Sequence, residues 1–254
     1  MGPHRSVAEE SVSFDRIADR YDETRGGEKR GRELSGEVAR WLVPGPSLEV
    51  GVGTGLVAAA LTERGAQVVG VDLSPAMLAK AHARLGPRVV VGDAMALPVA
   101  SASLANVYFV WVLHLVGDVP ATLAEAARVL RPGGRIIVLH GHPRDENEMD
   151  RVLAPLMAFR TERRDETDVI AGAAGRAGLV EVHRGYTESY PLHESPAHVA
   201  EQMELKTWSW LWRLDEAQWQ SLAVPAIAAL RAMPDPDRPR ELRAAQPIVV
   251  FSRP

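Results

Sequence analysis

Three glycines alternate with other residues in the segment Glu49-Val50-Gly51-Val52-Gly53-Thr54-Gly55. A glycine carries no Cβ atom, so this segment can form a tight turn and let the main chain approach a ligand closely. Asp72 stands seventeen residues after Gly55, at the end of a second apolar run. Its carboxylate could accept hydrogen bonds from both hydroxyls of a ribose. Together these residues predict a binding site for a nucleoside cofactor.

The spacing of the glycines bears on which nucleoside would bind. A dinucleotide-binding turn has the pattern G-x-G-x-x-G/A. Counted from Gly51, its third small position falls on Leu56, and this bulky residue argues against NAD(P). No Gly-Lys-Ser/Thr follows the turn, so the segment is not a Walker motif either.

The glycine segment and Asp72 can form one site only if the strands before them end at the same edge of a sheet. Between residues 48 and 140, short β-branched runs alternate with helical patterns, which is typical of successive βαβ units and a parallel sheet. Ser74 and Asp118 are expected to cap helices of these units. We expect strands at 48–52, 67–72, 88–91, 105–112 and 135–140, and later ones at 179–183 and 248–251.

The later part of the chain is less regular. It predicts helices near residues 149–161 and 169–177, and two more that open at Ser195 and Asp215. The length suits a single α/β domain that spans 1–254 and carries insertions. Within it we expect a flexible tail at 1–12, N-terminal cap helices at 12–42, a cofactor-binding core at 46–140 and a helical, Trp-rich lid insertion at 186–246.

Four segments resemble class I S-adenosylmethionine-dependent methyltransferases. They are residues 48–61, Val69-Gly70-Val71-Asp72-Leu73-Ser74-Pro75, Gly92-Asp93-Ala94, and residues 127–134. Residues 14–22 and 113–115 further resemble the branch that contains the ubiquinone and menaquinone biosynthesis methyltransferases, with a methyltransferase type 11 domain. The resemblance implies a Rossmann-like, doubly wound, mostly parallel sheet of seven strands, in the order 3-2-1-4-5-7-6 with the last strand antiparallel.

The same resemblance implies S-adenosyl-L-methionine as cofactor and S-adenosyl-L-homocysteine as product. Glu49, Gly51, Gly53 and Gly55 would line the methionyl half, and Asp72 would bind the ribose. The remaining cofactor contacts that it implies are Leu73 against adenine, Asp93 and Ala94 at the adenine edge, Val110 and Trp111 at the methionine backbone, and Tyr21 closing over the cofactor.

Methyl transfer from a sulfonium is an in-line displacement, so the protein has to align an acceptor and, where necessary, remove a proton. His114 is the best candidate base, because it follows the fourth strand and titrates near neutral pH when unperturbed. A buried histidine with a packing role is the alternative. His140 and His142 are weaker candidates, and His140 could instead line the acceptor site.

Trp208, Trp210 and Trp212 lie close together, with Trp219 nearby, and could form a lid over a flat or apolar acceptor. Their alternation does not follow helical spacing, which favours an extended segment over a helix packed on the core. The acceptor is expected to be a small organic molecule.

Composition excludes several classes. The chain has no cysteine, which removes thiolate catalysis and fits a reducing cytoplasm, and its net charge of -4 argues against nucleic acid. No apolar run is long enough to predict a membrane span, and no residues are spaced to hold a metal. The chain could be a monomer or a homodimer. An NAD(P)-dependent oxidoreductase and a non-catalytic cofactor-binding protein remain alternative functions.

Overall fold

The computed structural model describes residues 7–24, 26–141, 147–158 and 165–254, with side chains from residue 14 onward. The chain divides into two compact units, whereas the sequence predicts one domain with insertions. Unit 1 comprises Met1–His142, Arg164–Thr187 and Gln246–Pro254, and unit 2 comprises Pro143–Arg163 and Glu188–Ala245. The predicted insertion at 186–246 therefore provides most of unit 2.

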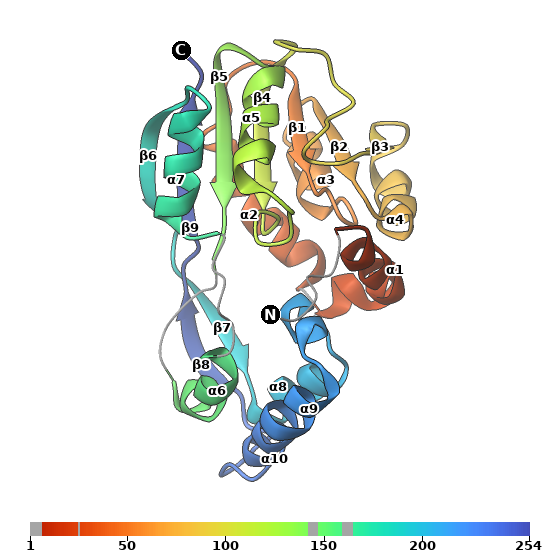
Figure 1. Ribbon diagram of the computed structural model, residues 1–254, viewed down its shortest axis with the longest axis vertical. Coiled ribbons are helices and arrows are strands. Elements are labelled where there is room, and N and C mark those ends of the chain that lie inside the picture. Colours follow the sequence, from red (N-terminus) through yellow and green to blue (C-terminus); the bar gives the residue numbers. More distant parts are fainter. Residues whose placement is uncertain (1–6, 25, 142–146, 159–164) are drawn as a thin grey trace. The chain divides into compact units, whose positions relative to one another are not determined.

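Unit 1 contains a seven-stranded sheet (Figure 1). Its first five strands run parallel to one another, and its last strand in the sequence is antiparallel to both strands beside it. This confirms the predicted α/β fold and strand order. In sheet order the strands are β3 (Val89–Val91), β2 (Val68–Asp72), β1 (Ser47–Val50), β4 (Leu104–Val110), β5 (Leu130–Leu139), β9 (Pro247–Ser252) and β6 (Val180–Tyr186).

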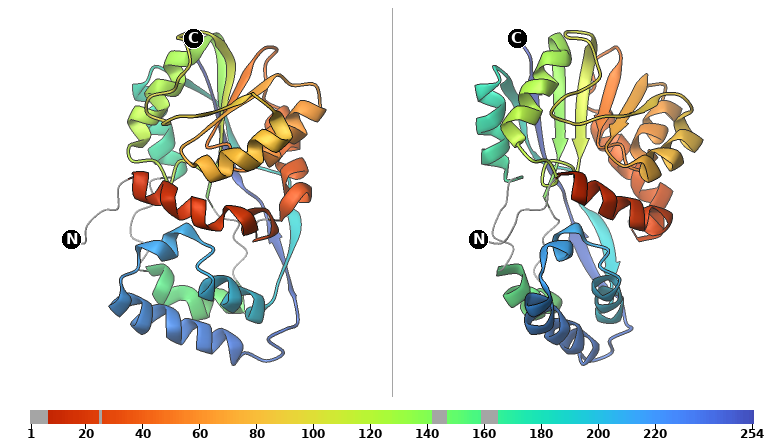
Figure 2. Two further views of the ribbon diagram at one scale, coloured as in Figure 1. Left: turned by 90° about the vertical axis from the view of Figure 1, so that its right-hand side faces the viewer. Right: turned by 45° about the vertical axis from the view of Figure 1, so that its right-hand side comes forward.

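Helices cover both faces of this sheet (Figure 2). Successive side chains of a strand point to opposite faces, so Ile136 and Val138 of β5 join one apolar cluster while Ile137 and Leu139 join the other. The helices on the first face are α5 (Val119–Val129) and α7 (Thr167–Arg176). Those on the second face are α2 (Gly27–Ala39), α3 (Leu56–Glu63) and α4 (Pro75–Leu85).

The predicted helix caps are confirmed. The Ser74 hydroxyl accepts a hydrogen bond from the Met77 amide at 3.1 Å, and the Asp118 carboxylate accepts one from the Ala121 amide at 2.8 Å. A side chain in this position satisfies one of the amides that a helix start leaves unpaired. Both caps fix where a helix begins after a strand at the carboxyl edge of the sheet.

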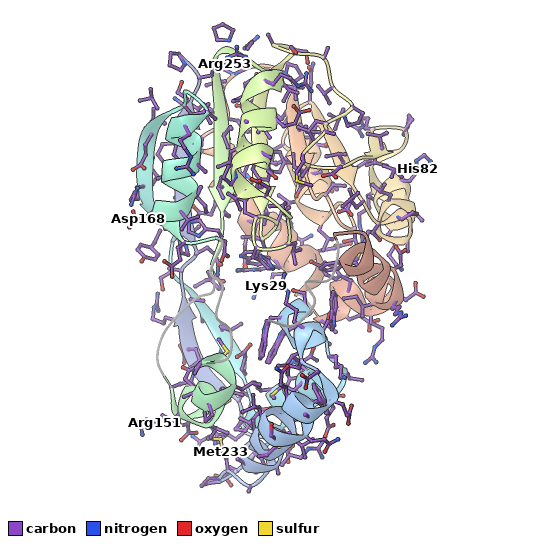
Figure 3. All side chains as sticks on the ribbon, viewed as in Figure 1. Lys29, His82, Arg151, Asp168, Met233 and Arg253 are labelled. Carbon is purple, nitrogen blue, oxygen red and sulfur yellow. The ribbon has the colours of Figure 1, made fainter. Side chains whose placement is uncertain are left out.

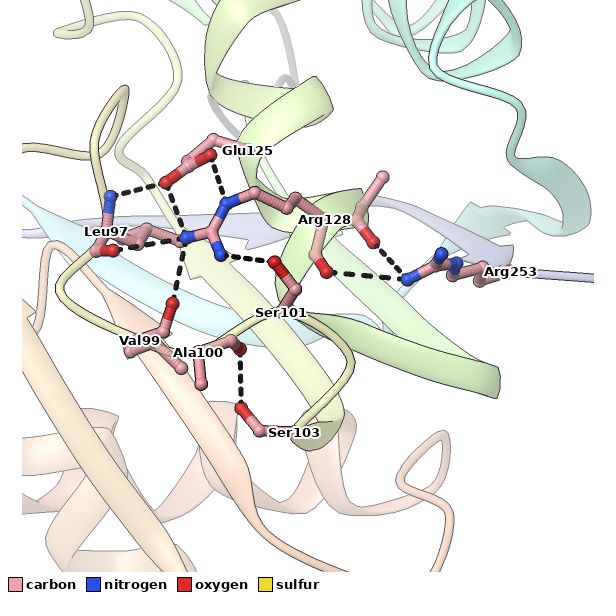
Figure 4. Close-up of polar contacts among 9 residues, drawn as sticks. Leu97, Val99, Ala100, Ser101, Ser103, Glu125, Arg128 and Arg253 are labelled. Carbon is pink, nitrogen blue, oxygen red and sulfur yellow. Dashed lines mark hydrogen bonds and ion pairs between the residues drawn. The ribbon is translucent and has the colours of Figure 1, made fainter.

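Arg128 of α5 ties down the loop between β3 and β4, and Arg253 (Figure 3) holds the end of α5 itself. The Arg128 guanidinium donates to the Val99 carbonyl and forms an ion pair with Glu125 (Figure 4). The Glu125 carboxylate also accepts a hydrogen bond from the Leu97 amide at 2.8 Å. Arg253 donates to the main chain at the end of α5. The hydrogen bond from Arg128 holds the pKa of Glu125 below its ordinary value. This network fixes residues 97–101 of the loop between β3 and β4.

Unit 2 has a core of its own. Met149, Leu156, Val199, Met203 and Leu230 are buried together in it. Its elements are α6 (Glu148–Ala158), the antiparallel pair β7 (Tyr190–Glu194) and β8 (Arg240–Ala244), α8 (Pro196–Glu204), the 3₁₀ helix η1 (Ser209–Arg213), α9 (Glu216–Gln218), the π-helix η2 (Trp219–Ala223) and α10 (Val224–Arg231). Among all described residues, no helix is long and apolar enough to cross a membrane.

The N-terminal helix α1 (Val7–Thr24) is longer than expected. It begins inside the segment 1–12 that the sequence predicts to be a flexible tail, so residues 7–12 are helical. Residues 1–6 lie outside the described part of the chain. Together, α1 and α2 occupy the region predicted to hold the cap helices.

Candidate functional site

The glycine turn follows β1 directly. Gly51 and Gly53 have φ angles of 71° and 54°, in the left-handed region that glycine adopts without strain. A Cβ atom on Gly51 would lie 2.4 Å from Cγ2 of Val112, whereas one on Gly53 would have no atom within 4 Å. Gly51 is therefore a close-packing position, and Gly53 faces open space that a ligand could fill.

Asp72 joins this turn to the end of β2. Its carboxylate accepts hydrogen bonds from the Gly53 amide at 2.8 Å and the Ser74 amide at 2.9 Å. Burial raises the pKa of Asp72, and the hydrogen bonds from backbone amides oppose this shift. Each carboxylate oxygen still has acceptor capacity beyond these two contacts. Asp72 is thus a buried acid, held rigidly beside the glycine turn.

A cleft opens at the carboxyl ends of β1, β2 and β4, where open α/β sheets bind ligands. All of its lining residues belong to unit 1. The predicted cofactor-binding residues that line it are Tyr21, Gly51, Gly53, Asp72, Leu73, Asp93, Ala94, Val110 and Trp111.

Helix α1 forms one wall of the cleft. Phe14 and Tyr21, two helical turns apart, both line it, and their rings meet edge to face at 6.2 Å. The same helix is bound to α4 by three aspartates spaced along it. Asp15 accepts from the Ser74 hydroxyl and the Ala76 amide, Asp19 pairs with Lys80 at 3.0 Å, and Asp22 pairs with Arg84 at 2.7 Å.

Trp111 lies at the end of β4 with a φ of 55°, which is unfavourable for a residue with a bulky side chain. Its indole N–H donates to Oε1 of Gln246 at 2.9 Å. The Arg30 guanidinium lies 4.8 Å from the centre of its ring, within the range of a cation–π contact. Three separate parts of the chain therefore fix this wall of the cleft.

Comparison with known proteins agrees with this geometry. Residues 48–138 match a family model described as a methyltransferase domain. The matched segment runs from β1 to β5 and contains the glycine turn, Asp72, Asp93 and Trp111.

Individual relatives extend this similarity. The chain is 38% identical to a demethylmenaquinone methyltransferase of Thermus thermophilus, over 51% of this chain and 64% of that protein. It is 36% identical to a ubiquinone/menaquinone biosynthesis C-methyltransferase of Paracoccus denitrificans, over 53% of this chain and 62% of that protein. The chain thus spans less than two thirds of the length of these relatives.

Among solved structures, the chain resembles a SAM-dependent methyltransferase, possibly a histamine N-methyltransferase, from Thermotoga maritima. The TM-score is 0.60 at 18% identity, over 96% of this chain and 100% of that one. At this identity the likeness concerns the fold, and it extends beyond residues 48–138 to nearly the whole chain.

Two predicted cofactor residues are not among those that line the cleft of unit 1. Glu49 is buried on the sheet face that carries α3, where it accepts a hydrogen bond from the Tyr108 hydroxyl at 3.1 Å. Burial raises the pKa of Glu49 to about 8. Gly55 precedes α3, and a Cβ atom on it would lie 3.2 Å from Cα of Ala81. Close packing of α3 against α4 accounts for this glycine.

The candidate bases occupy different environments. His114 is half-buried in the turn after β4 and is not one of the residues that line the cleft. His140 is buried at the end of β5, with Nε2 3.2 Å from the Thr167 hydroxyl. Burial lowers its pKa, and Asp165 opposes this shift, so His140 is neutral at pH 7. His142 lies outside the described residues.

The tryptophans lie in unit 2, outside residues 48–138. The expectation of an extended segment is wrong for Trp210 and Trp212, which belong to the 3₁₀ helix η1, while Trp208 precedes it in an extended conformation. A 3₁₀ helix has three residues per turn, so the α-helical spacing used for the prediction does not apply. The Trp208 and Trp210 rings stack at 5.8 Å, and both are partly buried against the core of unit 2.

Sequence reasoning missed several cleft residues. Phe14 could have been found from its spacing, because it lies seven residues before Tyr21 and so shares its helix face. Gln246 and Arg30 do not line the cleft but contact Trp111, and they gave no local signal because they come from distant parts of the chain. The other cleft residues that were missed are Val50, Val71, Ser74, Met77, Gly92, Val112, Leu115, Val116 and Gly117.

Proposed function

We propose that this chain transfers a methyl group from S-adenosylmethionine to a small organic acceptor. The observation that carries the proposal is the junction of Gly53 and Asp72, where an open main-chain surface adjoins a buried carboxylate. A nucleoside cofactor needs both features. The carboxylate binds its ribose hydroxyls, and the open turn lets the protein main chain approach it closely. The methyltransferase domain and the activities named for its relatives support the same reaction.

Each cleft residue then has a role. Asp72 accepts hydrogen bonds from the ribose hydroxyls, Leu73 packs against adenine, and the carboxylate of Asp93 accepts from its amino group. Gly51, Gly53, Val110 and Trp111 lie along the methionyl part, where Glu49 and Gly55 contribute through the conformation of the turn. Tyr21 closes over the cofactor from α1, and with Phe14 it excludes water.

When bound, the cofactor supplies an electrophilic methyl group on a sulfonium. The protein must hold the acceptor in line with that methyl group and keep water away from it. Where the acceptor atom loses a proton, His114 is the proposed base, since it lies in the turn that follows Trp111 at the cleft wall. His140 is buried and neutral, and could also accept a proton.

The acceptor is proposed to be a flat, largely apolar ring, of the kind that the names of the quinone-type relatives indicate. Stacked aromatic side chains bind such rings at low entropic cost. Trp208, Trp210 and Trp212 of unit 2 are the proposed contacts to the acceptor, and His140 of unit 1 is a separate candidate.

Calorimetric titration with S-adenosylmethionine, S-adenosylhomocysteine and NADH in parallel tests the cofactor. We expect the first two to bind and NADH not to bind. Binding of NADH alone would instead favour an oxidoreductase. A screen of acceptors, beginning with hydroquinones, then follows methyl transfer by mass spectrometry. Tight cofactor binding without turnover on any acceptor would contradict the enzymatic part of the proposal.

A further inference from the structure

The indole of Trp111 is held by a residue 135 positions away in the sequence. Gln246 is completely buried, and its Oε1 accepts the hydrogen bond from the indole N–H. We propose that Gln246 is a positioning residue, which acts through Trp111 to set the affinity of the cleft for its cofactor. The inference rests on the proposed function, because the cofactor is the ligand whose binding it modulates.

The conformation of Trp111 is the first argument. A left-handed φ of 55° is unfavourable for a bulky residue, so other contacts must hold it. The Trp111 amide donates to the Leu139 carbonyl at 3.0 Å, which fixes the main chain. Arg30 covers the ring but cannot accept a hydrogen bond. Gln246 thus supplies the directional contact that orients the indole edge.

Gln246 is itself held on both sides by Thr187. The main-chain amide of Thr187 donates to the main-chain carbonyl of Gln246 at 2.9 Å. The main-chain amide of Gln246 donates to the Thr187 hydroxyl at 2.9 Å. Both residues are buried, so neither hydrogen bond competes with bulk water. Because its main chain is fixed twice, the Gln246 side chain offers Trp111 an acceptor at a defined place.

The position of this pair in the chain is the second argument. Thr187 is the last residue of unit 1 before the chain enters unit 2, and Gln246 is the first after it returns. Directly beyond them, Tyr190 of β7 pairs with Ala244 of β8. The acceptor for the cleft tryptophan is therefore built in unit 1, where the chain leaves this unit and returns to it.

A double-mutant cycle tests the proposal. Gln246→Met keeps the size of the side chain but removes the acceptor, and Trp111→Phe keeps a ring but removes the donor. Loss of one buried hydrogen bond should weaken binding of S-adenosylhomocysteine roughly three- to tenfold in either variant. The double variant should be no weaker than the weaker single variant, because both changes remove the same interaction.

Gln202→Met is the matched control, since Gln202 is a buried glutamine of α8 in unit 2. It should change the affinity less than about twofold. Denaturation in urea without ligand establishes that each variant is folded at the temperature of the titration. Wild-type affinity in folded Gln246→Met, or losses that multiply in the double variant, would overturn the proposal.

A second measurement does not depend on the cofactor. Solvent exchange of the Trp111 indole N–H, followed by NMR in ligand-free protein, should be faster in Gln246→Met and unchanged in Gln202→Met. Unchanged exchange in Gln246→Met overturns the positioning role. Failure of the wild-type protein to bind S-adenosylhomocysteine overturns the proposed function instead, so the two failures are distinguishable.

Discussion

At the scale of single residues, the carboxylate of Asp72 both binds the main chain and lines the cleft. It holds the amides of Gly53 and Ser74, and it presents its remaining acceptor capacity to the cleft. An asparagine in its place has one acceptor oxygen, so it cannot hold both amides and a sugar hydroxyl. We expect Asp72→Asn to weaken S-adenosylhomocysteine binding by about 2 kcal/mol, roughly 30-fold, in calorimetric titration.

Asp118→Asn serves as its control, because Asp118 caps α5 and lies outside the cleft lining. Burial raises the pKa of Asp72. The wild-type affinity should therefore fall as the pH is lowered through that raised pKa, and the asparagine variant should not show this decline. Equal affinities of wild type and Asp72→Asn at neutral pH would remove Asp72 from the site.

Glu49 gives a prediction on stability. Its pKa is raised from 4.5 to about 8, so between these values the folded protein holds a proton that the unfolded chain has lost. The contribution of Glu49 to stability is therefore fully present below pH 4.5 and is lost as the pH rises to about 8. In this window the free energy of unfolding should fall by up to about 1.4 kcal/mol per pH unit.

Glu49→Gln should remove this slope, because glutamine keeps an acceptor for the Tyr108 hydroxyl but carries no charge. Urea denaturation at several pH values measures it. Glu63→Gln, at an exposed position of α3, should leave the slope as in the wild type. A slope that persists in Glu49→Gln would show that another group causes it.

At the scale of elements, the pairing of α1 with α4 is the contact most open to test. Asp22 pairs with Arg84 and also accepts from the Thr54 hydroxyl at 2.5 Å, beside the glycine turn. Asp22→Asn weakens a partly exposed pair, so its cost in stability should stay below about 1 kcal/mol. Since Phe14 and Tyr21 of α1 line the cleft, we expect S-adenosylhomocysteine to dissociate several-fold faster.

Stopped-flow displacement measures that rate. Glu28→Gln, which breaks an exposed pair with Arg32 on α2, should leave it unchanged. If the rate of Asp22→Asn equals that of the wild type, α1 does not retain the cofactor.

The elements also differ in how far the sequence could predict them. From β1 to α4, each strand, turn and cap carries its own local signal, such as Ser74 before Pro75, and the structure confirms them. The pair β7 and β8 was missed, because its strands lie far apart in the sequence and β8 is rich in charge. The helical form of Trp210 and Trp212 was missed because the spacing was judged against an α-helix.

Some residues of the candidate site could also be predicted from the sequence, and others could not. Gly53 and Asp72 could be predicted, since each is fixed by a strand end within its own βαβ unit. The burial of Glu49 away from the cleft depends on α3 and Tyr108, and pattern alone does not reveal it. The hydrogen bond from Trp111 to Gln246 depends on the folded sheet, in which β4 and β9 lie on either side of β5.

At the scale of the whole molecule, the two units have separate cores, and all residues that line the cleft belong to unit 1. A ligand stabilises the folded state that it binds, by about 2.7 kcal/mol at 100 times its Kd. We expect saturating S-adenosylhomocysteine to slow amide hydrogen exchange at residues 50–55, 71–74, 92–94 and 110–117. Exchange in residues 188–245 should change less than twofold.

Mass spectrometry of exchanged peptides makes the measurement. The Asp72→Asn variant at the same ligand concentration should show weaker protection at every one of these segments. Protection concentrated in residues 188–245 would place the ligand in unit 2 and contradict the cleft as its site.

The reciprocal hydrogen bonds between Thr187 and Gln246 bring together the two ends of the segment that separates them. A segment whose ends already meet can be lengthened, shortened or exchanged without parting the strands that carry it. Evolution, or a protein engineer, could therefore graft a different insert between β6 and β9, with a matching change of α6, and leave the glycine turn and Asp72 in place.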